Sequence, residues 1–127
     1  MKGNWTIIGS LAGLAVASQP KGIHAHDLFT DEVWPKVLAG KCLKCHKAGG
    51  DAEESRFVLQ DPAKDGSAGK AVSWGHNRKV FLEISKKRTK DGKSWLVLEK
   101  PVEGVEHEGG KILKLGSPRH RMLKDYV

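Results

Sequence analysis

The stretch Cys42-Leu43-Lys44-Cys45-His46 decides how this chain folds, because it holds the only two cysteines of the 127 residues, with a histidine directly after them. On a helical turn, positions i and i+3 lie on one face, so both thiols can reach the two vinyl groups of one porphyrin. His46 follows at the position from which a neutral ring nitrogen can bind iron. The spacing therefore predicts one covalent c-type haem, with its iron, attached through Cys42 and Cys45.

Two other interpretations of the cysteine pair have less support. A disulfide oxidoreductase normally places Cys-x-x-Cys beside a βαβ pattern, and the sequence shows no such pattern. A zinc site needs four convergent ligands, and Cys45 and His46 are sequence neighbours that cannot easily bind the same tetrahedral ion. We therefore expect a haem rather than zinc or a bare disulfide.

Residues 1–25 have the layout of a secretory signal peptide, in which a positive charge, an apolar run and small residues follow one another. Lys2 supplies the charge, Trp5 to Ala17 form the run, and cleavage is expected after Ala17 or Ala25. The run is short for a bilayer span, so membrane association is expected only if the leader stays uncleaved. Because bacteria attach haem to thiols outside the cytoplasmic membrane, we expect a periplasmic or secreted protein.

Residues 26–127 are enough for one small domain, which we expect to be the haem domain. Apolar residues at helical spacing predict a first helix over residues 27–47, with Val33, Trp34, Val37 and Leu38 on its inner face. Pro35 is tolerated best in a first turn, so the regular part should begin near residues 30–34.

The rest of the domain is expected to contain two or three more helices separated by long loops. Residues 61–75 hold turn residues and are expected to be loop, and Asn77 is expected to cap a helix over residues 78–87. Residues 94–98 are helix or strand, and Ser117-Pro118 should begin a last helix. The expected fold class is therefore mainly α, with three to four helices packed around the haem.

From Val33 onward, the order of features resembles a monohaem c-type cytochrome domain of bacterial exported proteins. Glu108 stands where such domains commonly have the first of three glycines after the late histidine. The resemblance implies a cytochrome c-like helical fold and electron transfer. The segments that carry it are Val33–Leu38, Lys41–His46, Arg56–Leu59, His76-Asn77, Leu96–Pro101, His107-Glu108-Gly109-Gly110, Gly116-Ser117-Pro118 and Tyr126.

Ligation by His46 leaves the sixth position of the iron open. His107 is the leading candidate, because Gly109 and Gly110 let the backbone pass close to a flat ring. Met122 is the alternative, since His/Met ligation is common in cytochromes c, although a methionine in a terminal helix often fills a core. We expect His76 to lie in a turn or just before a helix cap, and His120 on a solvated basic face.

The chain is basic, with a formal net charge of +7. Five cations and one aspartate lie between Lys86 and Lys93, either as an ordinary solvated loop or as a docking surface for an acidic redox partner. An exported protein with few aromatic residues in its basic stretch is not expected to bind nucleic acid.

The leading functional hypothesis is a small electron carrier and not an enzyme, in which one haem passes one electron without a bound substrate. A haem peroxidase or small-ligand sensor would need an open sixth position, and no set of distal catalytic side chains is evident. A third possibility is a subunit of a larger complex in which the haem is structural.

Overall fold

The computed structural model describes residues 27–127. The expected signal peptide, with its cleavage positions after Ala17 and Ala25, lies outside these residues. Within residues 27–127, no helix is long and apolar enough to cross a membrane.

The described part of the chain is mainly helical, as the sequence predicted. It has no strand, and only two isolated β-bridges join Lys47 to Leu59 and Arg88 to Trp95. Six helical segments follow in the order η1 (Phe29–Cys42), η2 (Pro62–Lys64), α1 (Ser67–Ser85), α2 (Leu96–Glu99), η3 (Lys100–Val102) and α3 (Pro118–Tyr126).

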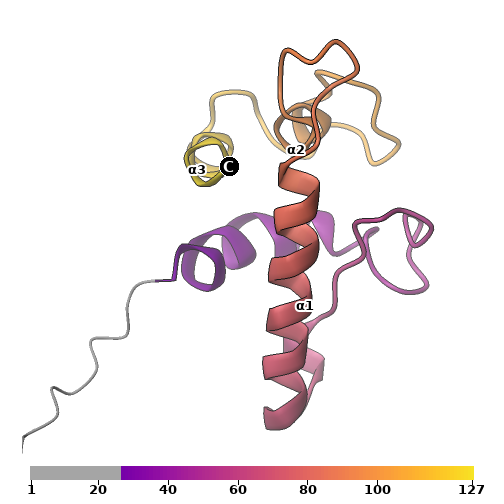
Figure 1. The fold of residues 1–127 in the computed structure, drawn as a ribbon, viewed down its shortest axis with the longest axis vertical. Coiled ribbons are helices and arrows are strands. Elements are labelled where there is room, and N and C mark those ends of the chain that lie inside the picture. The colour runs from indigo at the N-terminus through magenta and orange to yellow at the C-terminus, as the bar shows by residue number, and fades with distance from the viewer. Residues whose placement is uncertain (1–26) are drawn as a thin grey trace, which may run out of the picture.

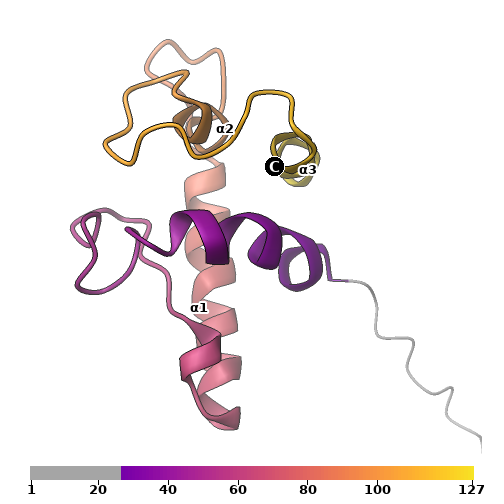
Figure 2. The ribbon, with the colours of Figure 1, turned by 180° about the vertical axis from the view of Figure 1, so that it is seen from behind.

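Helix α1 runs vertically through the middle of the molecule in Figure 1, and η1 crosses α1. The short helix α2 lies near the C-terminal end of α1, and α3 lies to one side. Seen from behind, the loops that follow η1 and η3 both project on the same side of α1 (Figure 2). These two loops contain the candidate site.

Helix η1 has π-type geometry, in which backbone bonds run from residue i to residue i−5. At its end the Leu43 N–H donates to the Leu38 carbonyl at 2.8 Å. The expected limits of this helix were wrong, since it begins at Phe29, contains Pro35 in its interior and ends at Cys42. The restriction on proline assumed α-helical bonding to residue i−4, which π-type bonding departs from.

The inner face expected for this first helix is confirmed. Val33, Trp34, Val37 and Leu38 are all buried. Burial of four large apolar side chains on one face is what fixes a helix against its neighbours, even where its hydrogen bonds are irregular.

Helix α1 begins much earlier than the sequence indicated, so the expected loop at 61–75 and the expected cap at Asn77 were both wrong. Asn77 is fully buried inside the helix and exchanges two hydrogen bonds with the backbone of Gln60, each of 2.8 Å. Ser73, one turn earlier, is also buried and bonds the carboxylate of Asp65. The inner face of this half-helix is polar, so it has no apolar periodicity to detect.

Three aromatic rings hold η1, α1 and α3 together. The ring centroids of Phe29 and Phe81 are 5.8 Å apart, those of Phe81 and Tyr126 5.7 Å, and those of Phe29 and Tyr126 6.2 Å. Ser117 caps α3 as expected, because its hydroxyl accepts from the His120 N–H at 3.3 Å. The core therefore sits where the three longer helices meet.

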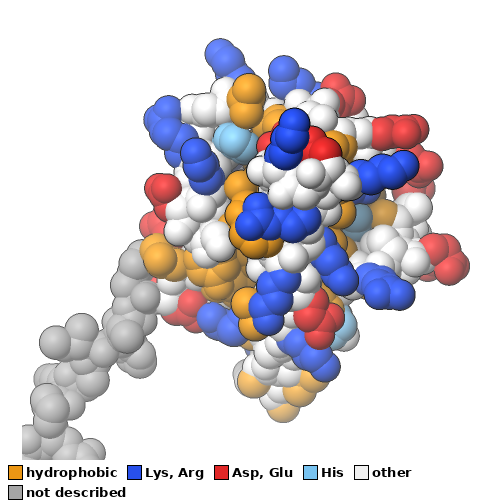
Figure 3. All heavy atoms as spheres, turned by 45° about the horizontal axis from the view of Figure 1, so that its top comes forward, with side chains coloured by type: hydrophobic (Ala, Val, Ile, Leu, Met, Phe, Trp, Pro, Cys, Tyr) orange, Lys and Arg blue, Asp and Glu red, His pale blue; other side chains and the backbone are white. Residues whose placement is uncertain are grey.

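The surface is rich in charged side chains. In Figure 3, Lys and Arg side chains run down the front of the molecule, and many of the Asp and Glu side chains lie toward its edges. Two large hydrophobic side chains on α1 are exposed among them, Val72 at 69% and Leu82 at 54%.

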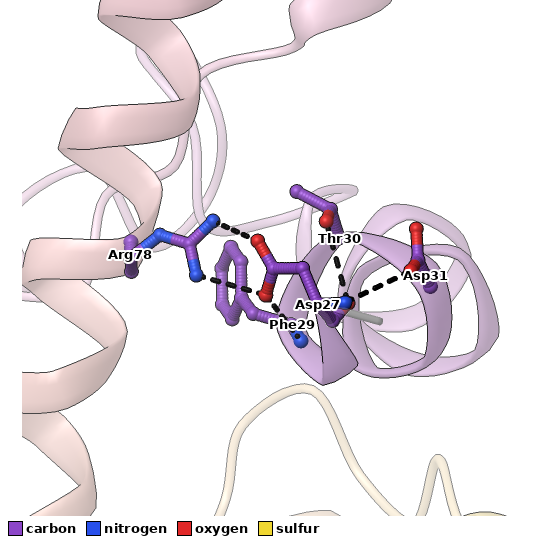
Figure 4. Close-up of polar contacts among 5 residues, drawn as sticks. All are labelled: Asp27, Phe29, Thr30, Asp31 and Arg78. Carbon is purple, nitrogen blue, oxygen red and sulfur yellow. Dashed lines mark hydrogen bonds and ion pairs between the residues drawn. The ribbon is translucent and has the colours of Figure 1, made fainter. Parts of the chain in front are cut away.

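The start of η1 is tied to α1 by an ion pair between Asp27 and Arg78 (Figure 4). One guanidinium nitrogen donates to Asp27 Oδ1 at 3.0 Å, and a second bonds Oδ2. The same guanidinium lies over the Phe29 ring, 5.1 Å from its centroid. The hydrogen bond from Arg78 holds the pKa of Asp27 well below its usual range.

Candidate functional site

The two cysteines lie where η1 gives way to a turn. Cys42 is the last residue of the helix, and the amides of Cys45 and His46 both point back to its carbonyl, at 3.2 and 2.9 Å. All three residues thus lie on one turn, and both sulfurs are free thiols.

Cys42 is buried, and this burial raises the pKa of its thiol to about 12. A disulfide oxidoreductase needs the opposite, a thiol whose pKa is lowered so that the thiolate can attack. The environment of Cys42 therefore does not favour this cysteine as the attacking thiolate of an oxidoreductase.

His46 is half-buried and its ring is held from behind. Its Nδ1 lies 2.9 Å from the carbonyl oxygen of Phe57 and 3.2 Å from the hydroxyl of Ser55. A carbonyl only accepts, so Nδ1 carries the proton and Nε2 keeps a lone pair for a metal ion. The Phe57 ring packs against the imidazole at a centroid distance of 5.0 Å.

The electrostatic surroundings favour the neutral form of His46. Burial lowers the pKa of this imidazole, the Phe57 carbonyl opposes the change, and the charges of His107 and Lys100 lower it further. Metal ligation requires a neutral imidazole, so this environment suits a ligand.

His107 lies in the loop after η3 and is held in the same manner. Its Nδ1 lies 2.9 Å from the Gly110 carbonyl, and the Gly110 amide donates to the His107 carbonyl at 2.8 Å. Gly110 has φ of +69°, a conformation that favours glycine. Gly109 runs so close to the imidazole that a Cβ there would lie 3.0 Å from His107 Cε1.

The structure brings His46 and His107 together, although they are far apart in sequence. Their ring planes differ by 8°, and their centroids are 6.4 Å apart. A metal–imidazole bond is about 2.0–2.1 Å and the ring centre lies about 1.1 Å behind the ligating nitrogen, so two imidazoles binding opposite sides of one ion have centroids about 6.3 Å apart. Among the described residues, no hydrogen bond engages Nε2 of either ring.

This donor set fits a covalently held haem. The described residues contain no group of three or more His, Cys, Asp or Glu side chains that could hold a metal ion by themselves. A haem iron needs fewer ligands from the protein, because the porphyrin supplies four nitrogens and the chain supplies at most two further ligands. Two thiols on one turn, and two nearly parallel imidazoles whose Nδ1 atoms are each held by a backbone carbonyl, meet that requirement.

The other candidate ligands make contacts away from His46 and His107. His76 lies inside α1, not in a turn, and its Nε2 bonds the Val58 carbonyl at 2.7 Å. His120 is buried, which corrects the expected solvated position. Its Nδ1 accepts from the Gly116 amide, and its Nε2 bonds the Leu98 carbonyl, both at 3.3 Å. Met122 packs against the hydrophobic core from α3.

Sequence reasoning missed the groups that orient the two imidazoles. The Phe57 and Gly110 carbonyls are backbone atoms, which no residue pattern marks. Ser55 is the one side chain that could have been noticed, two residues before Phe57, where its hydroxyl accepts from the Phe57 amide at 3.3 Å.

No protein-family model matches this chain, and neither does any curated protein or solved structure. The chemistry of the site therefore rests on the residues described above.

Proposed function

We propose that this chain is an electron-transfer protein of the bacterial periplasm or cell envelope. Cys42 and Cys45 would hold one haem c covalently, and His46 and His107 would bind its iron. The observation that carries the proposal is the parallel imidazole pair, 6.4 Å between centroids, with each Nδ1 held by a backbone carbonyl.

The haem supplies one-electron chemistry when bound, with its iron cycling between the ferrous and ferric states. The chain fixes the two ligands and shields them. Hydrogen bonds from Nδ1 to the Phe57 and Gly110 carbonyls set the tautomer of each ring and make Nε2 more basic. Ligation by two histidines gives a lower reduction potential than ligation by His46 and a methionine would.

With His107 on the sixth position, no coordination site is open to peroxide or to a small gaseous ligand. We therefore propose a carrier and not an enzyme or sensor. The backbone carbonyls that hold both imidazoles also suit electron transfer, because ligands held in place need to move little when the charge on the iron changes.

Absorption spectra of the haem-loaded protein test this assignment through two variants. In His107→Ala the ferric spectrum should change from low-spin to high-spin, and the ferrous form should bind carbon monoxide. Met122→Leu is the matched control and should keep the wild-type spectrum. The opposite pattern, a change in Met122→Leu with none in His107→Ala, would assign the sixth position to Met122.

A further inference from the structure

The outer face of α1 carries cations that form no ion pair with an acidic side chain of residues 27–127. Lys79, Leu82 and Lys86 recur at helical spacing on the side away from the core and are all exposed. Among the described residues, the ion pairs are those of Lys36 with Glu32 and of Arg78 with Asp27, so the cations on this face are unpaired. We call this surface the basic face, and it consists of Lys79, Leu82, Lys86, Lys87, Lys90 and Lys93.

The loop that continues the basic face has a defined shape. The Thr89 amide donates to the Ser94 carbonyl at 3.0 Å, and the Thr89 hydroxyl bonds the Asp91 carboxylate at 2.6 Å. The Lys93 amide bonds the same carboxylate at 3.0 Å. Asp91 is therefore engaged inside the loop, while Lys90 and Lys93 are exposed.

The loops that hold the two imidazoles carry both signs of charge. Their exposed carboxylates are interspersed in sequence with the exposed cations Lys44, Arg56, Lys111 and Lys114, so these loops attract an acidic protein less than the basic face does. These carboxylates belong to Asp51, Glu53 and Glu54 in the loop of His46, and to Glu103, Glu106 and Glu108 in the loop of His107.

Aromatic contacts connect the basic face to the candidate haem site. Phe81 lies on the inner side of α1, next to Leu82 in sequence, and is buried. Its ring centroid is 6.2 Å from that of Phe57, whose ring packs 5.0 Å from His46. Packed side chains thus run without interruption from the back of the basic face to the proximal histidine.

From these observations we propose that the basic face is the docking surface for an acidic redox protein, and that the contacts of Phe81 and Phe57 with His46 couple the docked partner to the iron. This inference rests on the proposed electron-transfer function. The step is a single electron transfer, in which ferrous iron becomes ferric and the partner's centre is reduced, with no bond made or broken. Leu82 supplies an exposed apolar side chain between Lys79 and Lys86 in sequence, and Glu83 is the one exposed carboxylate of α1 beside it.

Electron transfer from the reduced, haem-loaded protein to an acidic blue-copper protein tests the proposal by stopped flow. The variant Lys79→Glu/Lys86→Glu changes the basic face, and Lys64→Glu/Lys70→Glu is the control, with the same change in net charge near the other end of α1. At low ionic strength, attraction between complementary charges raises the association rate of two proteins by about 10- to 1,000-fold. We expect the first variant to be about tenfold slower than the control, with a weaker dependence on salt.

Equal rates for the two variants would overturn the proposal, because only net charge would then matter. Binding of the wild-type protein to vesicles of anionic lipid, lost in Lys79→Glu/Lys86→Glu without any change in electron transfer, would also overturn it and assign the face to a lipid surface. Lys79→Gln/Lys86→Gln repeats the test without charge reversal, should the first variant fold poorly. Failure of the proposed function itself would be distinct, since no haem would then be attached.

Discussion

The contact between Gly109 and His107 allows the axial-ligand assignment to be tested by adding one methyl group. In Gly109→Ala the new Cβ would lie 3.0 Å from His107 Cε1 and 3.4 Å from Nε2. Ordinary contact begins near 3.4 Å, so the ring must move by about 0.4 Å, close to the roughly 0.5 Å within which a functional site must be held. Inserting a methyl group into a packed site costs about 1–3 kcal/mol.

If that cost falls on the bond between His107 and iron, the affinity of this ligand drops by about 5- to 150-fold. We expect a growing high-spin fraction in the ferric spectrum and measurable binding of carbon monoxide to the ferrous form. Gly75→Ala is the matched control, because nothing lies within 4 Å of its new Cβ, and helix α1 should gain about 0.5–1 kcal/mol. A Gly109→Ala protein with the wild-type spectrum and no reaction with carbon monoxide would refute the reasoning.

Three further changes test the fold. Phe81→Ala should lower the free energy of unfolding by about 3–5 kcal/mol in denaturant titrations, whereas exposed Leu82→Ala should be nearly neutral. Ser117→Ala removes the cap of α3 and should cost about 1 kcal/mol, or about 4–8 °C in Tm, and an unchanged Tm would contradict the cap. Arg78 keeps the pKa of Asp27 in the folded protein below its value in the unfolded chain. Their ion pair therefore stabilises the fold at pH values above the unfolded pKa, and this stabilisation is lost as the pH falls. Circular dichroism between pH 7 and pH 3 should therefore show less loss of stability in Arg78→Ala than in the wild type, and equal losses would contradict the ion pair's role.

Apolar periodicity and capping residues were enough to predict part of this fold. The inner face of η1 and the start of α3 at Ser117-Pro118 follow from local rules, because a buried stripe and a cap depend on neighbouring residues only. The first half of α1 could not be predicted in this way. Its inward residues Ser73 and Asn77 are polar and gain their stability from hydrogen bonds to residues 60–65.

The candidate site, too, could be predicted from the sequence only where neighbouring residues determine it. Cys42, Cys45 and His46 are marked by their spacing, since the proposed haem needs all three on one turn. The position of His107 opposite His46 depends on how two distant loops fold, and the carbonyls that orient the rings belong to the backbone. His120 illustrates the converse, because its basic neighbours suggested a solvated face while its own ring is buried between Gly116 and Leu98.

The central claim is that Cys42 and Cys45 hold a haem covalently, and intact mass of the protein tests it most directly. After expression in a host with a haem-attachment system, we expect the mass of the polypeptide plus one haem, with no thiol left to react with an alkylating reagent. A mass equal to the bare polypeptide, with both cysteines alkylated or joined to each other, would contradict the account.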